Sequence, residues 1–218
     1  MGNVEIFIAQ ASGTLNKHSD KIMRAFGDAV KTAKNINLSA VDVIVTDNPH
    51  GVIPEMGVGG YTPGAHVVYL SIDPEFNLKE EDISLTLIHE FHHAMRWRDP
   101  GYGKTFKEAL VTEGLACLYE EQVSGTAPIY TQVDIKDAAK TISKDTLNDN
   151  NYPHHELFIN GNNDVPRWFG YTLGYKIAKH AAGTLKMSAA ELVNEPYSSF
   201  DKSVRALVES ESADSSDA

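Results

Sequence analysis

The sequence predicts an α+β fold in which a small sheet with one helix comes first and helices follow. Two observations favour this order. Three short apolar runs with strand character come before residue 74, and patterns with helical spacing dominate from about residue 78 onward. The chain has no internal repeat. Strands and helices are therefore segregated along the chain, which is typical of the α+β class.

The N-terminal part is expected to contain three strands and one helix. Residues 4–9 and 41–46 are predicted strands, and a helix over about 16–34 lies between them because apolar side chains recur there at helical spacing. A third strand is predicted over 66–73. The glycine-rich segment 56–64 is interpreted as loop.

Capping signals divide the C-terminal part into helices. Asn77 with Glu80, and Thr105 with Glu108, have the spacing of a capping box, in which the two side chains satisfy each other's backbone N–H groups. Pro100 ends the helix that begins near residue 78, because proline disturbs the preceding turn. Further helices are predicted over 105–123, weakly over 135–147, over 168–182, from 188 and over 200–208, with an asparagine-rich loop over 148–164.

The length and composition suit one globular domain. A chain of 218 residues is long enough for a domain with a proper core, or for two lobes with a cleft, and is short for two independent domains. We expect a single domain over residues 1–208, with an α/β lobe over about 1–100 and a helical lobe over about 101–208. The polar, acidic residues 209–218 are expected to form a disordered tail.

Charge and cysteine content exclude several kinds of partner and site. The net charge of -11 argues against nucleic acid and anionic membranes as partners. Cys117 is the only cysteine, so an intrachain disulfide and a zinc site with several thiolates are both excluded. The N-terminus lacks the pattern of a signal peptide, and no apolar run reaches about 18 residues, so we expect a cytoplasmic location. The sequence does not indicate an oligomeric state.

The segment 83–98 carries the pattern His-Glu-x-x-His, which is typical of zinc hydrolases. On a helix with about 100° per residue, His89 and His93 lie within roughly 40° of each other and can face one ion. Neutral imidazoles are good zinc ligands, and a carboxylate beside a zinc-bound water can take its proton. Glu90 is therefore the candidate general base. His92 lies outside the arc of the two ligands and is not expected to bind the metal.

A catalytic zinc needs a third protein ligand, and two residues compete for this position. Asp99 lies six residues after His93, where a metzincin-like site has its last ligand, but the glycine of that pattern is replaced by Arg96. Glu113 lies on the next predicted helix among apolar neighbours, where a solvated carboxylate is out of place. Gly114 beside it would allow another backbone to approach closely. Glu113 is therefore the favoured ligand.

Taken together, these motifs resemble a bacterial family of predicted zinc-dependent proteases that is similar to the gluzincin metallopeptidases. The resemblance rests on the His89–His93 motif, on Glu113-Gly-Leu-Ala, and on Gly170-Tyr-Thr-Leu-Gly-Tyr. It implies a zincin-like fold, His89, His93 and Glu113 as zinc ligands, and Glu90 as the catalytic base. It also implies that Tyr171, in a Tyr-x-x-Gly motif, stabilises the oxyanion of the tetrahedral intermediate. Alternatively, Tyr171 and Tyr175 form an aromatic core stripe, and the oxyanion donor is His154 or His155.

The predicted function is zinc-dependent hydrolysis of peptide bonds in a peptide or protein substrate.

The chain departs from two related kinds of enzyme. Cys117 stands where thermolysin-like enzymes have an aspartate, and the signature that binds a free amino terminus in aminopeptidases is absent. The strand over 66–73 is a candidate for the edge along which an extended substrate pairs. Two alternatives are a non-catalytic metal-binding or peptide-binding protein of the same fold, and a metal-dependent hydrolase of another amide or ester.

Overall fold

The chain contains two compact units, Met1–Arg98 and Asp99–Ala218, in a computed structural model that describes residues 3–209. The first unit is a four-stranded mixed sheet with helices, and the second is helical, which confirms the α+β class. Residues 210–218 of the predicted tail lie outside the described part. Within residues 3–209, none of the helices combines the length and the apolar character that crossing a bilayer requires.

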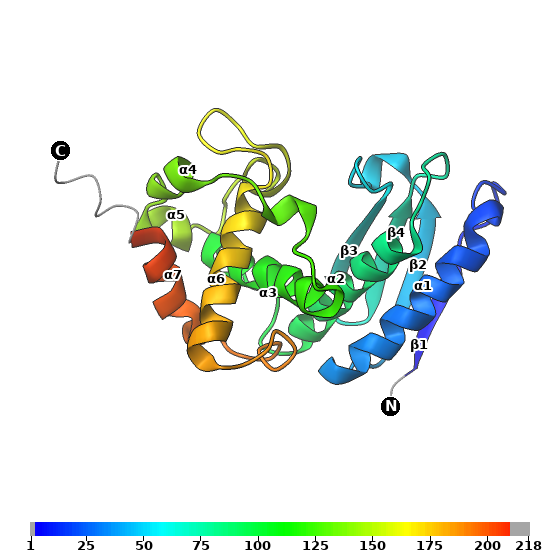
Figure 1. Cartoon of the computed structure of the whole chain (residues 1–218), viewed down its shortest axis with the longest axis horizontal. Coiled ribbons are helices and arrows are strands. Elements are labelled where there is room, and N and C mark those ends of the chain that lie inside the picture. The colour runs from blue at the N-terminus through cyan, green and yellow to red at the C-terminus, as the bar shows by residue number, and fades with distance from the viewer. Residues whose placement is uncertain (1–2, 210–218) are drawn as a thin grey trace. The chain divides into compact units, whose positions relative to one another are not determined.

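The first unit places two helices over one face of its sheet (Figure 1). Its strands follow the order β1-β2-β4-β3, in which β1, β2 and β4 are parallel and β3 runs antiparallel to β4. Short 3-10 turns flank α1 and follow β2. The main elements are β1 (Val4–Ile8), α1 (Ser19–Thr32), β2 (Val41–Asp47), β3 (Val58–Gly64), β4 (Val67–Ile72) and α2 (Glu80–Arg98).

Alternation along the strands separates a buried face of the sheet from an open one. Val41, Val43 and Val45 of β2 are fully buried, whereas the side chains between them point to the opposite face. On the open face, one cross-strand row runs across all four strands, and such neighbours stabilise a sheet by direct contact. The row consists of Phe7, Ile44, Tyr69 and Tyr61.

Two expectations about this sheet are wrong. The segment 56–64 is not all loop, because its residues from Val58 onward form β3. Glycine normally weakens a strand, but here it permits close packing: a Cβ on Gly59 would lie 2.2 Å from the carbonyl oxygen of Gly51. The strand predicted over 66–73 exists as β4, but it lies inside the sheet between β2 and β3. The edge strand next to it is β3.

The second unit consists of helices joined by loops and turns (Figure 1). Thr105 and Glu108 form the predicted capping box at the start of the first of these helices, and Gly125 ends it in a left-handed conformation. The elements are α3 (Phe106–Ser124), α4 (Lys136–Lys140), α5 (Lys144–Asn148), the π-helical turn η5 (His155–Asn160), α6 (Phe169–Leu185) and α7 (Asp201–Glu209), with 3-10 turns at Ile129–Thr131 and Tyr197–Phe200.

Three predictions for this unit need correction. The weak helix over 135–147 is two short helices, α4 and α5, and the loop over 148–164 contains the turn η5. Ser188 and Glu191 make the predicted reciprocal hydrogen bonds, but turns rather than a helix follow. Pro196 leaves little length for a helix there, because proline lacks the N–H group that a helix interior requires.

The helices α3 and α6 cross at a pair of glycines. A Cβ on Gly114 would lie 2.0 Å from the carbonyl oxygen of Gly174, and a Cβ on Gly174 would lie 2.3 Å from the carbonyl oxygen of Leu110. Backbones that approach this closely leave no space for any side chain. The expected role of Gly114 in close backbone approach is confirmed.

We predict that Gly114→Ala destabilises the protein by about 1–3 kcal/mol or more, because the two helices must separate. Gly183→Ala on α6 is the matched control. Its added Cβ meets nothing within 4 Å, so we expect no loss and a gain of up to about 1 kcal/mol from helix propensity. Urea unfolding of both variants measures the difference, and equal stabilities would contradict the close crossing.

Candidate metal centre

In the first unit, α2 carries two adjacent buried histidines. The ring centroids of His89 and His93 lie 4.6 Å apart, with the rings nearly perpendicular. Their four-residue spacing places them one helical turn apart on the same side of α2. Only 6% of His89 and 4% of His93 is exposed to solvent, so both imidazoles are held in the protein interior.

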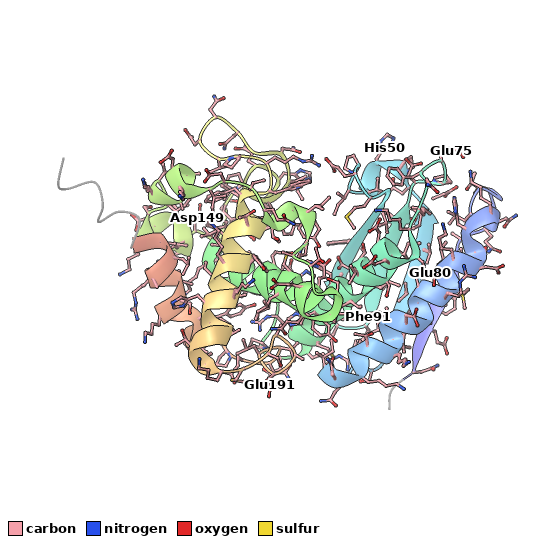
Figure 2. All side chains as sticks on the ribbon, viewed as in Figure 1. His50, Glu75, Glu80, Phe91, Asp149 and Glu191 are labelled. Carbon is pink, nitrogen blue, oxygen red and sulfur yellow. The ribbon has the colours of Figure 1, made fainter. Side chains whose placement is uncertain are left out.

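Contacts at both ends of α2 fix the position of these histidines. At the N-terminus, Arg24 of α1 forms an ion pair of 2.9 Å with Glu80, which lies beside α1 in Figure 2. At the C-terminus, the Arg98 guanidinium donates to the Ser39 hydroxyl at 2.8 Å and to the carbonyl oxygens of Ala40 and Ala65 at 3.2 and 3.3 Å. The helix is thereby tied to two loops of the sheet.

Glu90 lies between the two histidines in sequence and is also buried. The Thr62 hydroxyl of β3 lies 2.6 Å from Oε2 of its carboxylate. Hydrogen bonds from a hydroxyl to an ionised carboxylate are short and strong, so this contact favours one orientation of the side chain. The sequence interpretation did not identify Thr62, because it assigned this segment to a loop.

In the second unit, Glu113 is a buried carboxylate on α3 with aromatic groups around it. The Tyr102 hydroxyl donates a hydrogen bond to Glu113. Burial raises the pKa of Tyr152 to about 12, and the negative charge of Glu113 adds to this effect. Burial lowers the pKa of His154, while the charge of Glu113 opposes that shift. Near Glu113 there are thus a phenol, Tyr152, whose pKa is raised and a histidine biased toward its neutral form.

Two more potential ligands share the buried side of α3. Cys117 and Glu120 follow Glu113 by four and seven residues, which places all three on one helical face. Glu120 accepts a hydrogen bond from the Tyr130 hydroxyl, and burial together with the Glu120 charge raises the pKa of Tyr130 well above its usual range. The signal for Glu120 in the sequence is its position seven residues after Glu113 on the same predicted helix.

A protein-family model matches the part of the chain that carries these residues. A family model described as "Predicted Zn-dependent protease (DUF2268)" matches residues 16–202. The chain belongs to this family. The match extends over most of both units and includes His89, Glu90, His93 and Glu113, so the expected family resemblance is confirmed. No curated protein and no solved structure matches the chain.

Of the two candidates for the third ligand, Asp99 is the one whose surroundings fit less well. Asp99 is exposed, whereas His89, His93 and Glu113 are all buried. His92 is also completely buried on α2. The two histidines and the glutamate have the ligand types of a catalytic zinc site, and their donor set fits the metal that the family description implies.

The candidates for the oxyanion donor, Tyr171, His154 and His155, have different surroundings in this family member. The Tyr171 ring lies 5.2 Å from the ring of Tyr130 and 5.3 Å from the ring of Phe158, measured between centroids. The His154 ring stacks on Phe158 at 4.7 Å, although the residue as a whole is exposed, as is His155. Tyr171 is thus held by aromatic contacts near the start of α6.

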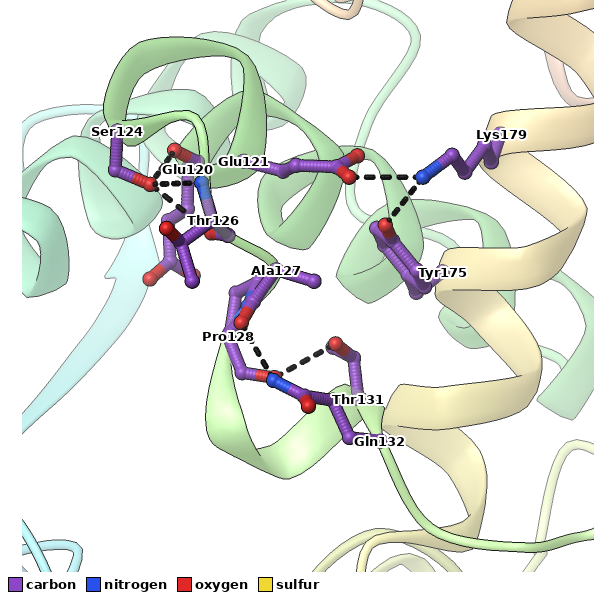
Figure 3. A network of polar contacts seen from close by, with 10 residues as sticks. All are labelled: Glu120, Glu121, Ser124, Thr126, Ala127, Pro128, Thr131, Gln132, Tyr175 and Lys179. Carbon is purple, nitrogen blue, oxygen red and sulfur yellow. Dashed lines mark hydrogen bonds and ion pairs between the residues drawn. The ribbon is translucent and has the colours of Figure 1, made fainter.

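Tyr175, one turn further along α6, is itself buried, and its hydroxyl takes part in a polar network with the exposed side chain of Lys179. Its hydroxyl accepts a hydrogen bond of 2.8 Å from Lys179, which also forms an ion pair of 2.8 Å with Glu121 (Figure 3). The Lys179 ammonium lies 5.1 Å from the centroid of the Tyr175 ring. In this motif, Gly170–Tyr175, the Tyr175 hydroxyl is therefore engaged by a charged pair.

Proposed function

We propose that this protein hydrolyses peptide bonds by a zinc-dependent mechanism. The observation that carries the proposal is the buried, adjacent pair His89 and His93 on a helix that also presents Glu90, in a chain of a family described as predicted zinc-dependent proteases. Two imidazoles and a general base on one helix are the residue types that metal-assisted hydrolysis requires. The cytoplasmic location expected from the sequence stays a prediction.

In this proposal, His89, His93 and Glu113 hold the zinc ion. All three are buried and have suitable ligand atoms, as do Cys117 and Glu120 on the same helix as Glu113. Glu113 is favoured by the family resemblance and by its spacing from His93. When bound, zinc lowers the pKa of a coordinated water and polarises the substrate carbonyl. Tyr102 would support the Glu113 carboxylate through its hydrogen bond.

Glu90 is the proposed general base. Its carboxylate takes a proton from the attacking water and then delivers that proton to the leaving amine, so the same group serves both halves of the reaction. The contact with Thr62 supports this role because it restrains the carboxylate without adding a positive charge beside it. Tyr171 is proposed to donate its phenol hydrogen to the developing oxyanion.

The proposed substrate is an extended peptide, and β3 is the strand that favours it. Because β3 lies at the end of the sheet next to β4, its outer backbone groups beyond Val58, which pairs with Ile53, are the natural site for strand addition. This replaces the expectation that the strand over 66–73 pairs with the substrate. β3 also carries the residue that contacts Glu90, so a peptide on this strand would run past the general base.

We predict that purified protein contains one zinc ion per chain and that Glu113→Gln reduces its zinc content. Loss of one of three ligands weakens binding sharply, because an incomplete site holds the metal poorly. Cys117→Ala is expected to keep its zinc and serves as the control on the same helix. Elemental analysis after dialysis measures both. Zinc loss in Cys117→Ala with retention in Glu113→Gln would assign the third ligand to Cys117.

We predict that Glu90→Gln keeps its zinc and lowers kcat for peptide hydrolysis by about 10²–10⁴-fold, because the amide cannot accept the proton. Cleavage of a mixed peptide library, read by mass spectrometry, measures the rate. An active Glu90→Gln variant would contradict the role of Glu90. A wild-type protein that binds zinc and cleaves no peptide or protein would favour a non-catalytic binding function.

We predict that Tyr171→Phe lowers kcat by about 10²-fold or more, because one oxyanion donor is lost. Tyr175→Phe is the matched control and should retain activity, since its hydroxyl contacts Lys179 at the surface. Kinetics of both variants on the same substrate separate the two tyrosines. Equal losses would indicate a packing role for the whole motif.

A further inference from the structure

Thr62 occupies an irregular position in β3. The register between β3 and β4 pairs Tyr61 with Tyr69 and then Gly64 with Val67, so three steps on β3 match two steps on β4. One extra residue is therefore accommodated between Tyr61 and Gly64. Irregularities of this kind, or β-bulges, change the direction of a side chain and occur often beside active sites.

The side chain at this irregularity is directed at Glu90. The Thr62 oxygen lies 2.6 Å from Oε2 of Glu90 and 3.2 Å from the Glu90 carbonyl oxygen. A hydroxyl has one hydrogen to donate, and the shorter contact, to the carboxyl oxygen, takes it. Thr62 is only 5% exposed, so little water competes for this hydrogen bond.

Gly60, which comes two residues before Thr62 on β3, also lies against the Glu90 side chain. A Cβ on Gly60 and the Thr62 hydroxyl would both meet the Glu90 side chain, so both positions face α2. A Cβ on Gly60 would lie 2.4 Å from Cγ and 2.5 Å from Oε1 of Glu90. The absence of a side chain at Gly60 thus provides the space that the Glu90 side chain occupies.

The backbone of Thr62 is anchored to the same helix. Trp97 lies seven residues after Glu90, which places both on one side of α2, and its indole N–H donates to the Thr62 carbonyl oxygen at 2.8 Å. The position of Thr62 relative to α2 is therefore fixed independently of its hydroxyl. Removing the hydroxyl leaves this anchor and the space beside Gly60 unchanged.

From this geometry we infer that Thr62 is a positioning residue for the general base. It holds the Glu90 carboxylate in the orientation from which proton transfer occurs, and Gly60 and Trp97 keep the space and the strand in place. The inference rests on the proposed hydrolytic function. A glutamate has three rotatable side-chain bonds, and small errors in the placement of a catalytic group cost large factors in rate.

The test compares Thr62→Val, which replaces the hydroxyl by a methyl of similar size, with Thr62→Ser, which keeps the hydroxyl. We expect Thr62→Val to lower kcat by about 10–100-fold with little change in KM or zinc content, and Thr62→Ser to recover most of the rate. Thr46→Val is the matched control: Thr46 lies on β2, which β4 separates from β3, and should keep full activity.

A Thr62→Val variant with the kcat of the wild-type protein would overturn the inference. Equal losses of kcat in Thr62→Val and Thr62→Ser would also overturn it. Loss of zinc in Thr62→Val would show a role in the metal site instead. If the wild-type protein itself cleaves no peptide, the proposed function fails separately. The contact is then tested in zinc-free protein, where the shifts in urea midpoint from Thr62→Val and Glu90→Ala should be less than additive; additive shifts would overturn it.

Discussion

Burial of three polar side chains on one face of α2 is the constraint on which the first unit depends. His89, Glu90 and His93 are each almost completely shielded from water, and a buried polar group without compensating contacts costs about 1–3 kcal/mol. The surrounding elements reduce this cost through directed contacts. Thr62 contacts Glu90, and the ends of α2 are bound to α1 and to the loops of the sheet.

The helical unit has a corresponding arrangement around Glu113. Gly114 follows this glutamate directly and marks the point where α3 meets Gly174 of α6. Tyr171 lies three residues before Gly174, close to one turn of the helix. Gly114 and Gly174 therefore allow the backbones of α3 and α6 to approach closely. This crossing sets the positions of the nearby residues Glu113 and Tyr171.

Several predictions from the sequence follow from local chemistry and are confirmed. The helix that carries His89 and His93 forms over Glu80–Arg98 and ends before Pro100, as predicted. The Thr105–Glu108 capping box also forms as expected. The strand β3 was missed because glycine and proline at Gly59, Gly60 and Pro63 carry loop propensity. That preference is outweighed by backbone pairing with β4 and by the close approach of Glu90.

The sequence by itself determined the α+β order, the family motifs and the residue types for zinc chemistry, because these depend on periodicity and on spacing within single helices. Only the tertiary structure decided which strand forms the edge, which hydroxyl reaches Glu90 and which tyrosine of α6 is engaged by Lys179. Each of these depends on contacts between segments distant in sequence. Strand order, a bulge and the direction of a side chain follow from packing, which no local pattern records.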